Sequence, residues 1–178
     1  MTRSAAGAPG DAGPDGQLDR LREAAFVAME RAYAPYSRFC VGAALLAADG
    51  TIVTGCNVEN AAYPSGICAE RGAVMAAVAA GHRSFRLLVL ATEADEPAPP
   101  CGACRQVIVE FAPHLPVVSV NRDGAERRWT MAELLPSPFT PASLESHFHP
   151  DAPHPAHGPA ETLRTSGAHP VIPEDHTT

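Results

Sequence analysis

The sequence contains no lysine, few aromatic residues (6%) and no long hydrophobic run. A helix that spans a bilayer needs about 20 consecutive apolar residues, whereas the longest apolar stretches here cover only residues 41–48 and 87–91. The N-terminus also lacks a basic stretch followed by an apolar one, which is the pattern of a secretory signal. We therefore expect no membrane span and no secretory signal.

Positive charge is also scarce. The 13 basic residues are all arginine, and 20 acidic residues bring the net charge to −7. Proteins that bind nucleic acids neutralise phosphates with a basic surface, and peripheral binding to anionic lipid has a similar requirement. The charge balance therefore argues against nucleic acids and against membranes as partners.

The chain has five cysteines, an odd number, at a density far below that of disulfide-stabilised scaffolds. Such usage is typical of a reducing compartment. We therefore expect free thiols and a cytoplasmic protein.

The composition changes twice along the chain. Residues 1–16 are mostly small or polar, with no large apolar residue after Met1, and residues 150–178 are rich in proline and histidine. Segments with so little apolar surface cannot offset the conformational entropy that ordering costs. We therefore expect disordered tails at 1–16 and 150–178, on either side of one folded domain at 17–149.

Helical and strand periodicities alternate within that domain. The spacing of apolar residues predicts helices over 18–33, 68–80, 101–111 and 131–135, and strands over 39–48, 51–58, 85–92, 116–121 and 127–130. Two Asp-Gly pairs, at 49–50 and 123–124, mark turns between strands. This order of elements predicts an α/β fold with helices on both faces of a sheet.

Three cysteines stand at the beginnings of two predicted helices, Cys68 on one and Cys101 and Cys104 on the other. The positive end of a helix dipole stabilises thiolates, and Cys-x-x-Cys spacing lets two of them bind one ion. A zinc ion with three protein ligands keeps a fourth position open to water. Glu70 follows Cys68 by two residues and is placed to accept a proton from that water. The spacing therefore predicts a catalytic zinc site.

Two other interpretations of the Cys-x-x-Cys pair are open. A redox pair would need neither a third cysteine nor Glu70, and Pro100 stands where redox motifs usually have an aromatic residue. A structural zinc site would need a fourth ligand, but the other cysteines, Cys40 and Cys56, fall in predicted strands. Small buried residues fit such positions, so the catalytic interpretation is favoured.

Several blocks of sequence carry a family resemblance. They are residues 33–39 with 41–45, 57–64 with 66–71, 100–106, and 134–136 with Phe139. Cys-Ala-Glu followed by Pro-Cys-x-x-Cys is the signature of zinc nucleoside and nucleobase deaminases, and the whole set resembles the small homotetrameric cytidine deaminases. The resemblance implies a three-layer α/β/α sandwich with a mixed central sheet of about five strands, assembled as a homotetramer with shared active sites.

The resemblance also implies the reaction. Cys68, Cys101 and Cys104 would bind Zn²⁺, and Glu70 would move protons while cytidine or deoxycytidine is hydrolysed to uridine or deoxyuridine and ammonia in pyrimidine salvage. In such enzymes an arginine directly after the glutamate donates hydrogen bonds to the thiolates. Arg71 matches that position and would offset the negative charge of three thiolates around one divalent ion.

Six residues are implied to contact the substrate: Phe39, Asn57, Glu59, Tyr63, Ala69 and Phe139. Phe39 and the Ala69 backbone would meet the base, and Asn57 and Glu59 would hydrogen-bond the ribose hydroxyls. Tyr63 and Phe139 would be supplied to the active site of a neighbouring subunit. Without the family, the two phenylalanines fit ordinary core packing and Tyr63, before Pro64, fits a turn.

Other functions remain open on the sequence alone. Blasticidin S deaminases and other small-molecule deaminases share the three-cysteine site, although Asn57 and Glu59 favour a ribose-bearing substrate. A nucleic-acid-editing deaminase is disfavoured by the acidic charge, and a nucleotide substrate by the few cations near the motifs. A zinc-stabilised binding protein without catalytic activity is the alternative from another class.

Overall fold

The computed structural model describes residues 14–145. The expected tail at 150–178, and all but the last three residues of the one at 1–16, lie outside that range. The chain divides after Thr140 into two units. The first unit contains every residue of the predicted site, and the second begins with the short helix α5 (Pro141–Glu145).

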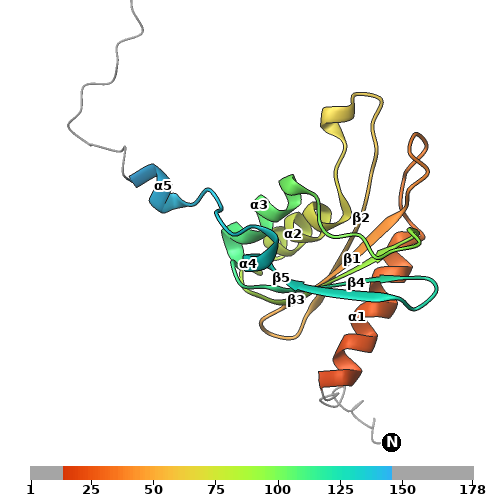
Figure 1. Ribbon diagram of the computed structural model, residues 1–178, viewed down its shortest axis with the longest axis horizontal. Helices are drawn as coiled ribbons and strands as arrows, with labels where there is room; N and C mark the ends of the chain where they lie inside the picture. The colour runs from red at the N-terminus through yellow and green to blue at the C-terminus, as the bar shows by residue number, and fades with distance from the viewer. Residues whose placement is uncertain (1–13, 146–178) are drawn as a thin grey trace, which may run out of the picture. The chain divides into compact units, whose positions relative to one another are not determined.

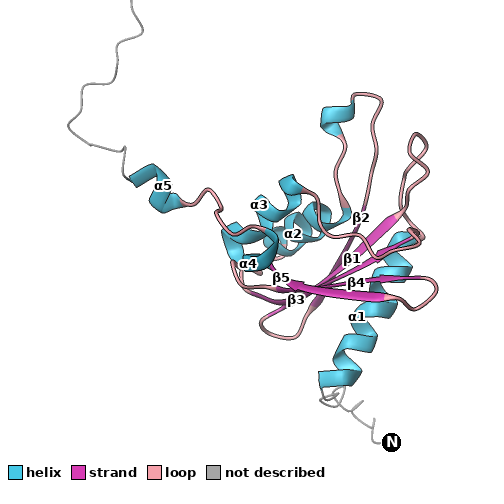
Figure 2. Cartoon of the chain, viewed as in Figure 1, coloured by secondary structure: helices cyan, strands magenta, loops and turns pink. Residues whose placement is uncertain are grey.

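A five-stranded mixed sheet forms the centre of the first unit (Figures 1 and 2). Its strands are β1 (Val41–Ala47), β2 (Ile52–Cys56), β3 (Phe85–Thr92), β4 (Pro116–Asn121) and β5 (Glu126–Thr130). They lie in the order β2-β1-β3-β4-β5, with β3 parallel to β4 and every other neighbouring pair antiparallel. This confirms the mixed sheet that the resemblance implied.

Helices cover both faces of the sheet. They are α1 (Pro14–Met29), α2 (Ala69–Ala79), α3 (Gly102–Phe111) and α4 (Met131–Leu134). The 3-10 turn η1 (Tyr63–Ser65) lies in the loop between β2 and α2 (Figure 1). Because side chains alternate along a strand, β3 separates two cores: Leu88 and Leu90 pack with α2 and α3, whereas Val89 and Ala91 pack with α1. The three-layer α/β/α arrangement is therefore confirmed.

Two glycines bring helices into direct contact with the sheet. A Cβ atom at Gly42 would stand 2.0 Å from the carbonyl oxygen of Ala25 in α1, and one at Gly55 would stand 2.4 Å from the carbonyl oxygen of Ala69 in α2. Glycine in a strand interior often marks such close approach of another backbone. Gly55 in β2 therefore determines how near the first turn of α2 lies to the sheet.

Helix α1 differs from the expected helix at both ends. It begins at Pro14, ahead of the domain boundary expected at residue 17, and ends at Met29, so the expected end at Tyr33 was wrong. Tyr33 instead pairs with the chain after β2: its N–H donates to the Asn57 carbonyl at 2.9 Å, and its carbonyl accepts from the Glu59 N–H at 2.8 Å. This long-range pairing satisfies the Tyr33 backbone, which a local apolar period cannot reveal.

No helix within residues 14–145 combines the length and the apolar character needed to cross a bilayer.

Candidate active site

The three predicted thiols meet on the side of the sheet that α2 and α3 cover. Cys68 precedes α2 and Cys101 precedes α3, each as the N-cap residue, and neither side chain makes a capping hydrogen bond. Their Sγ atoms and that of Cys104 all lie within 4.8 Å of one another. The Sγ–Sγ distance is 3.7 Å from Cys68 to Cys101 and 3.4 Å from Cys101 to Cys104. The positive ends of two helix dipoles therefore meet at one cluster of thiols.

This donor set fits zinc, which prefers sulfur and nitrogen ligands in a tetrahedral arrangement. Within the part of the chain that the structure describes, the cluster contains no fourth histidine, cysteine, aspartate or glutamate. Cys40 and Cys56 are free thiols outside it, and the Cys56 thiol donates to the Arg31 carbonyl at 3.5 Å. Three ligands leave one position for water, so the geometry favours a catalytic over a structural zinc site.

The pKa values of Cys68 and Cys104 are shifted in opposite directions. Hydrogen bonding from Cys104, with smaller contributions from Cys101 and Arg71, lowers the pKa of Cys68 well below the usual range of a thiol, although burial opposes this. The same interaction with Cys68, together with burial, raises the pKa of Cys104. Cys68 therefore has a lower pKa than Cys104 and loses its proton before Cys104 does.

Arg71 lies half-buried beside the cluster. Its Nη2 donates to the Gly66 carbonyl at 3.0 Å, and its buried Nε has no partner among the described residues. Burial lowers the pKa of the guanidinium, but the nearby thiols of Cys68 and Cys104 outweigh this effect and raise the pKa. Donation from Arg71 to the thiolates remains a prediction, and Nε is the free donor for it.

Glu70 lines a pocket of about 240 Å³ together with Cys68 and Cys101. Its side chain is almost fully buried, at 5% exposure, and this burial raises the pKa of its carboxyl group. A carboxyl group held beside the metal ligands and open to the pocket is placed to exchange protons with a bound molecule. The structure therefore brings the predicted proton carrier and the predicted ligands together.

Four of the six predicted substrate contacts line the same pocket: Phe39, Asn57, Glu59 and Ala69. Thr92, Ala98 and Pro99 also line this pocket, and no sequence motif had identified them as candidates. Residues 93–100 lie between the expected strand at 85–92 and the expected helix at 101–111, where no helix or strand was predicted. The prolines directly before Cys101 were the available signal, because proline restricts the backbone next to a ligand.

Asn57 holds the backbone that leads from Phe39 into β1. Its Oδ1 accepts from the Val41 N–H at 2.8 Å, and its Nδ2 donates to the Phe39 carbonyl at 2.8 Å. Both ends of the amide are therefore bound to the backbone on either side of Cys40. Phe39 is 38% exposed and is held at the pocket by this pairing.

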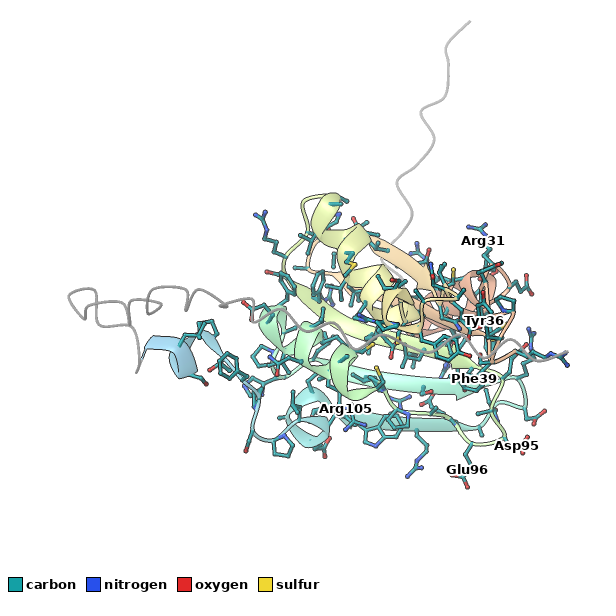
Figure 3. The ribbon with its side chains drawn as sticks, turned by 90° about the horizontal axis from the view of Figure 1, so that it is seen from above. Arg31, Tyr36, Phe39, Asp95, Glu96 and Arg105 are labelled. Atoms are coloured by element: carbon teal, nitrogen blue, oxygen red, sulfur yellow. The ribbon has the colours of Figure 1, made fainter. Side chains whose placement is uncertain are left out.

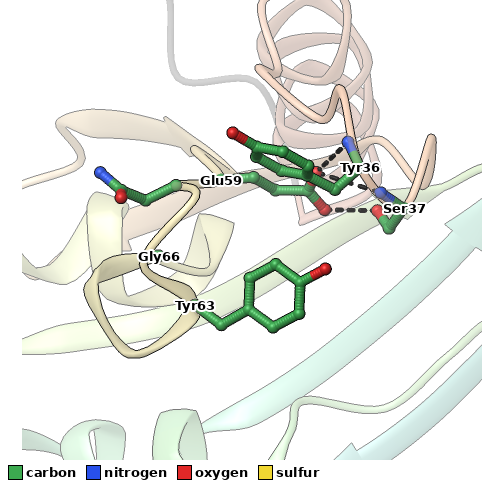
Figure 4. A pocket seen from close by; sticks show the side chains of 6 residues that line it. Tyr36, Ser37, Glu59, Tyr63 and Gly66 are labelled. Carbon is green, nitrogen blue, oxygen red and sulfur yellow. Dashed lines mark hydrogen bonds between the residues drawn. The ribbon is translucent and has the colours of Figure 1, made fainter. Parts of the chain in front are cut away.

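Glu59 holds the turn before Phe39 (Figure 4). Its carboxylate accepts from the Tyr36 N–H at 2.9 Å, from the Ser37 N–H at 3.2 Å and from the Ser37 hydroxyl. These bonds, the Ser37 hydroxyl foremost, lower the pKa of Glu59. The next residue, Arg38, has φ 58°, a left-handed conformation that costs a non-glycine residue about 1–2 kcal/mol. The Glu59 bonds therefore stabilise a strained turn at the edge of the pocket.

Tyr63 and Phe139 lie outside this pocket. Tyr63 is 76% exposed, and its ring packs edge-on to Tyr36 with the centroids 6.0 Å apart, in an adjoining pocket of about 310 Å³ (Figure 4). Phe139 is 58% exposed. Both aromatic side chains are available at the surface, and their contribution to a neighbouring subunit remains a prediction.

Comparison with known proteins agrees with this site. The family described as "Cytidine and deoxycytidylate deaminase zinc-binding region" matches residues 16–120. The chain is 52% identical over 118 residues to a cytidine deaminase of Sporosarcina psychrophila, covering 66% of this chain and 87% of that one. It is 40% identical over 126 residues to a cytidine deaminase of Mycobacterium tuberculosis, covering 71% and 92%.

Solved structures agree as well. The crystal structure of cytidine deaminase from Burkholderia pseudomallei matches with a TM-score of 0.66 and 49% identity, covering 68% of this chain and 98% of that one. All three thiols of the cluster lie within residues 16–120, the region that the family match covers. By its sequence, its fold and its three-cysteine cluster, this chain belongs to the cytidine and deoxycytidylate deaminase zinc-binding family.

Proposed function

We propose that this protein hydrolyses cytidine and deoxycytidine to uridine and deoxyuridine and releases ammonia. The observation that carries the proposal is that one pocket holds Glu70 next to the thiols of Cys68 and Cys101, with Cys104 completing the cluster. The relatives named cytidine deaminase support the same reaction at up to 52% identity. Pyrimidine salvage is the process that such a reaction serves.

The cluster and Glu70 divide the chemistry. Cys68, Cys101 and Cys104 would hold zinc, which would act as a Lewis acid and lower the pKa of a bound water to about 7. Glu70 takes a proton from the attacking water, delivers it to ring nitrogen N3, and then assists departure of the amino group from C4. Its burial suits both steps, because a raised carboxyl pKa lies closer to the operating pH, where one group can both accept and donate a proton.

Asn57 and Glu59 support recognition of the sugar. The Glu59 carboxylate accepts three hydrogen bonds from the Tyr36–Ser37 turn, and a carboxylate has about four acceptor positions. It therefore keeps capacity for one ribose hydroxyl. Phe39 and the Ala69 backbone, which line the same pocket, are placed for the base.

The assembly and the compartment are part of the same proposal. A homotetramer with shared active sites would give the exposed rings of Tyr63 and Phe139 a binding partner and a role. Five free thiols among the described residues support a reducing cytoplasm. Size-exclusion chromatography with mass measurement tests the assembly, since a stable active monomer would exclude shared sites.

A substrate panel tests the reaction. Purified protein is incubated with cytidine, deoxycytidine, cytosine, adenosine and blasticidin S, and ammonia is measured. We expect ammonia from the first two, with falling cytosine absorbance and loss of turnover on chelation. Ammonia from blasticidin S alone would favour the rival deaminase, and none from any substrate would favour a zinc-stabilised binding protein.

The variant Glu70→Gln tests the proton carrier. It keeps the shape of the side chain but cannot accept the proton, so we expect turnover to fall by roughly 10²–10⁴-fold while the zinc content stays at the wild-type level. Unchanged turnover in this variant would remove Glu70 from the mechanism.

A further inference from the structure

The segment from residue 93 to residue 100 connects β3 to α3 and forms one wall of the pocket. Ala98 and Pro99 line the pocket, and Cys101 follows directly. The segment forms no helix or strand, so no backbone ladder holds it in place. It contains prolines at positions 97, 99 and 100, whose fixed φ angles stiffen it. Its position is therefore set by packing of the buried Pro97 and Pro100 and by hydrogen bonds near its two ends.

Asn121, the last residue of β4, holds the beginning of the segment. Its side-chain Nδ2 donates to the Ala94 carbonyl at 3.3 Å and to the Asp95 carbonyl at 2.7 Å, while its Oδ1 accepts from the Ala125 N–H at 2.8 Å. The residue is only 3% exposed, so these bonds are shielded from competing water. One side chain thus fastens the wall to the β4–β5 turn.

The position of Asn121 in the sheet also places it beside the pocket. Its Cα pairs in register with that of Thr92, the last residue of β3, and Thr92 lines the pocket. The wall therefore begins immediately after the strand residue that Asn121 flanks. Asn121 itself does not line the pocket.

Arg105 holds the other end of the segment. Its Nε donates to the Pro100 carbonyl at 2.7 Å, and its Nη1 donates to the Leu134 carbonyl at 2.8 Å. Figure 3 shows Arg105 on α3, away from Asp95 and Glu96 at the outer end of the segment. Exposed contacts add to these bonds: Glu96 pairs with Arg127 at 3.7 Å, and Glu93 pairs with Arg122 at 3.8 Å and accepts from the Cys40 N–H at 3.4 Å. Such surface pairs contribute little.

We propose that Asn121 is a positioning residue of the active site, which sets where Ala98 and Pro99 stand against the bound nucleoside. The proposal rests on the function proposed above. Asn121 touches the wall and not the reacting atoms. The wall contacts the substrate equally in the ground state and in the transition state. Displacing the wall therefore weakens binding of both states and raises KM more than it lowers kcat.

Asn121→Asp is the sharpest variant. It keeps the acceptor for the Ala125 N–H but replaces the Nδ2 donor with an oxygen facing the Ala94 and Asp95 carbonyls. Asn121→Ala removes all three bonds and serves as the second variant. Arg127→Gln is the matched control, because it removes a surface contact to the same segment and leaves the buried bonds intact.

The full-length zinc-loaded protein is assayed with cytidine at a temperature well below the melting point of each variant, and bound zinc is measured. We expect KM to rise about tenfold in both Asn121 variants with kcat within about threefold of wild type, zinc content unchanged, and KM unchanged in Arg127→Gln.

Three results would overturn the proposal. They are an unchanged KM despite a lower melting temperature, a loss of kcat that accompanies loss of zinc, and failure of both variants to fold, which would assign Asn121 to stability alone. Absence of cytidine turnover in the wild-type protein is a different result, because it would remove the proposed function itself.

Discussion

The side-chain amide of Gln106 pairs with the backbone of Phe139 in both directions. Gln106 Nε2 donates to the Phe139 carbonyl at 2.6 Å, and the Phe139 N–H donates to Gln106 Oε1 at 3.2 Å. Gln106 comes two residues after Cys104 in α3. The helix that carries two of the metal ligands therefore also holds the segment that presents an exposed phenylalanine ring.

Gln106→Leu should have the same effect as Phe139→Ala. Loss of two hydrogen bonds, each contributing about 0.5–1.5 kcal/mol, releases the Phe139 backbone, and the ring is then no longer presented in one place. If Phe139 contributes to an active site, both variants raise the KM for cytidine, and the double variant is no worse than Phe139→Ala. Steady-state kinetics measure this, with Glu110→Gln on the exposed end of α3 as the control. Additive effects would contradict the link between the two residues.

Shared active sites make a further outcome testable with these variants. A Phe139→Ala subunit lacks the ring but retains Glu70, whereas a Glu70→Gln subunit retains the ring. Refolding the two variants together should raise activity at low cytidine concentration above the average of the two separate variants, because some sites then combine an intact Glu70 with an intact Phe139. If Phe139 acted only within its own subunit, the mixture would show no more than that average.

Gly55→Ala should displace helix α2 and, with it, the Cys68 thiol. The added Cβ would stand 2.4 Å from the Ala69 carbonyl oxygen and 2.4 Å from the Ala73 nitrogen, so α2 must move away from β2. We expect a loss of about 1–3 kcal/mol in the free energy of unfolding and weaker zinc binding, because α2 carries Cys68 at its N-cap. Denaturant unfolding and metal analysis measure both.

Gly72→Ala is the matched control for that variant. Its Cβ would meet the Cys56 carbonyl oxygen at 3.5 Å, an ordinary contact, and the residue lies within α2. Alanine is favoured over glycine in a helix interior by about 0.5–1 kcal/mol, so this variant should be as stable as wild type or more so. A large loss of stability here would show that α2 tolerates no added volume at all.

The five cysteines should separate into two groups. Changing Cys68, Cys101 or Cys104 to serine should abolish stoichiometric zinc and activity, since a hard hydroxyl replaces a thiolate in a site with three protein ligands. Cys40→Ser and Cys56→Ala should keep the metal, because neither thiol belongs to the cluster. Metal analysis of the five purified variants checks this, and zinc loss from Cys40→Ser would point to a fourth ligand.

The ion pair between α1 and β5 should make stability depend on pH. Burial opposes ionisation of Glu126, but hydrogen bonds from Arg22 and Arg128 outweigh it and lower the pKa of Glu126 below 4.5. A lowered folded-state pKa contributes stability that is complete above the unfolded value and is lost as the pH falls through the folded value. Glu126→Gln should therefore cost up to about 1 kcal/mol at pH 7 and nothing once wild-type Glu126 is protonated.

Thermal unfolding between pH 7 and pH 3 measures this difference. Asp19→Asn is the control, because Asp19 also pairs with Arg22, at 2.7 Å, but its side chain is 71% exposed. Its effect should be smaller at every pH. A Glu126→Gln penalty that persisted at the lowest pH would mean that packing, and not charge, accounts for it.

The sequence by itself predicted which three thiols gather in one cluster and which carboxyl group lies beside them. The starts of helices α2 and α3 carry Cys68, Glu70, Cys101 and Cys104. The spacing of apolar residues predicts both helices, and the reactivity of a thiol depends on its position at a helix end. The alternation of elements likewise predicted an α/β fold with helices on both faces. Helix starts and the alternation of helices and strands depend on residues close together in the sequence, so they can be predicted from it.

Only the tertiary structure decided the shape of the pocket. Hydrogen bonds between residues far apart in the chain place the segment 93–100 as a wall of the pocket, through Asn121. Such bonds also pair Tyr33 with the chain after β2, beyond the end of helix α1. Such contacts contribute free energy only when distant segments are already packed together. The local spacing of apolar residues therefore cannot predict them.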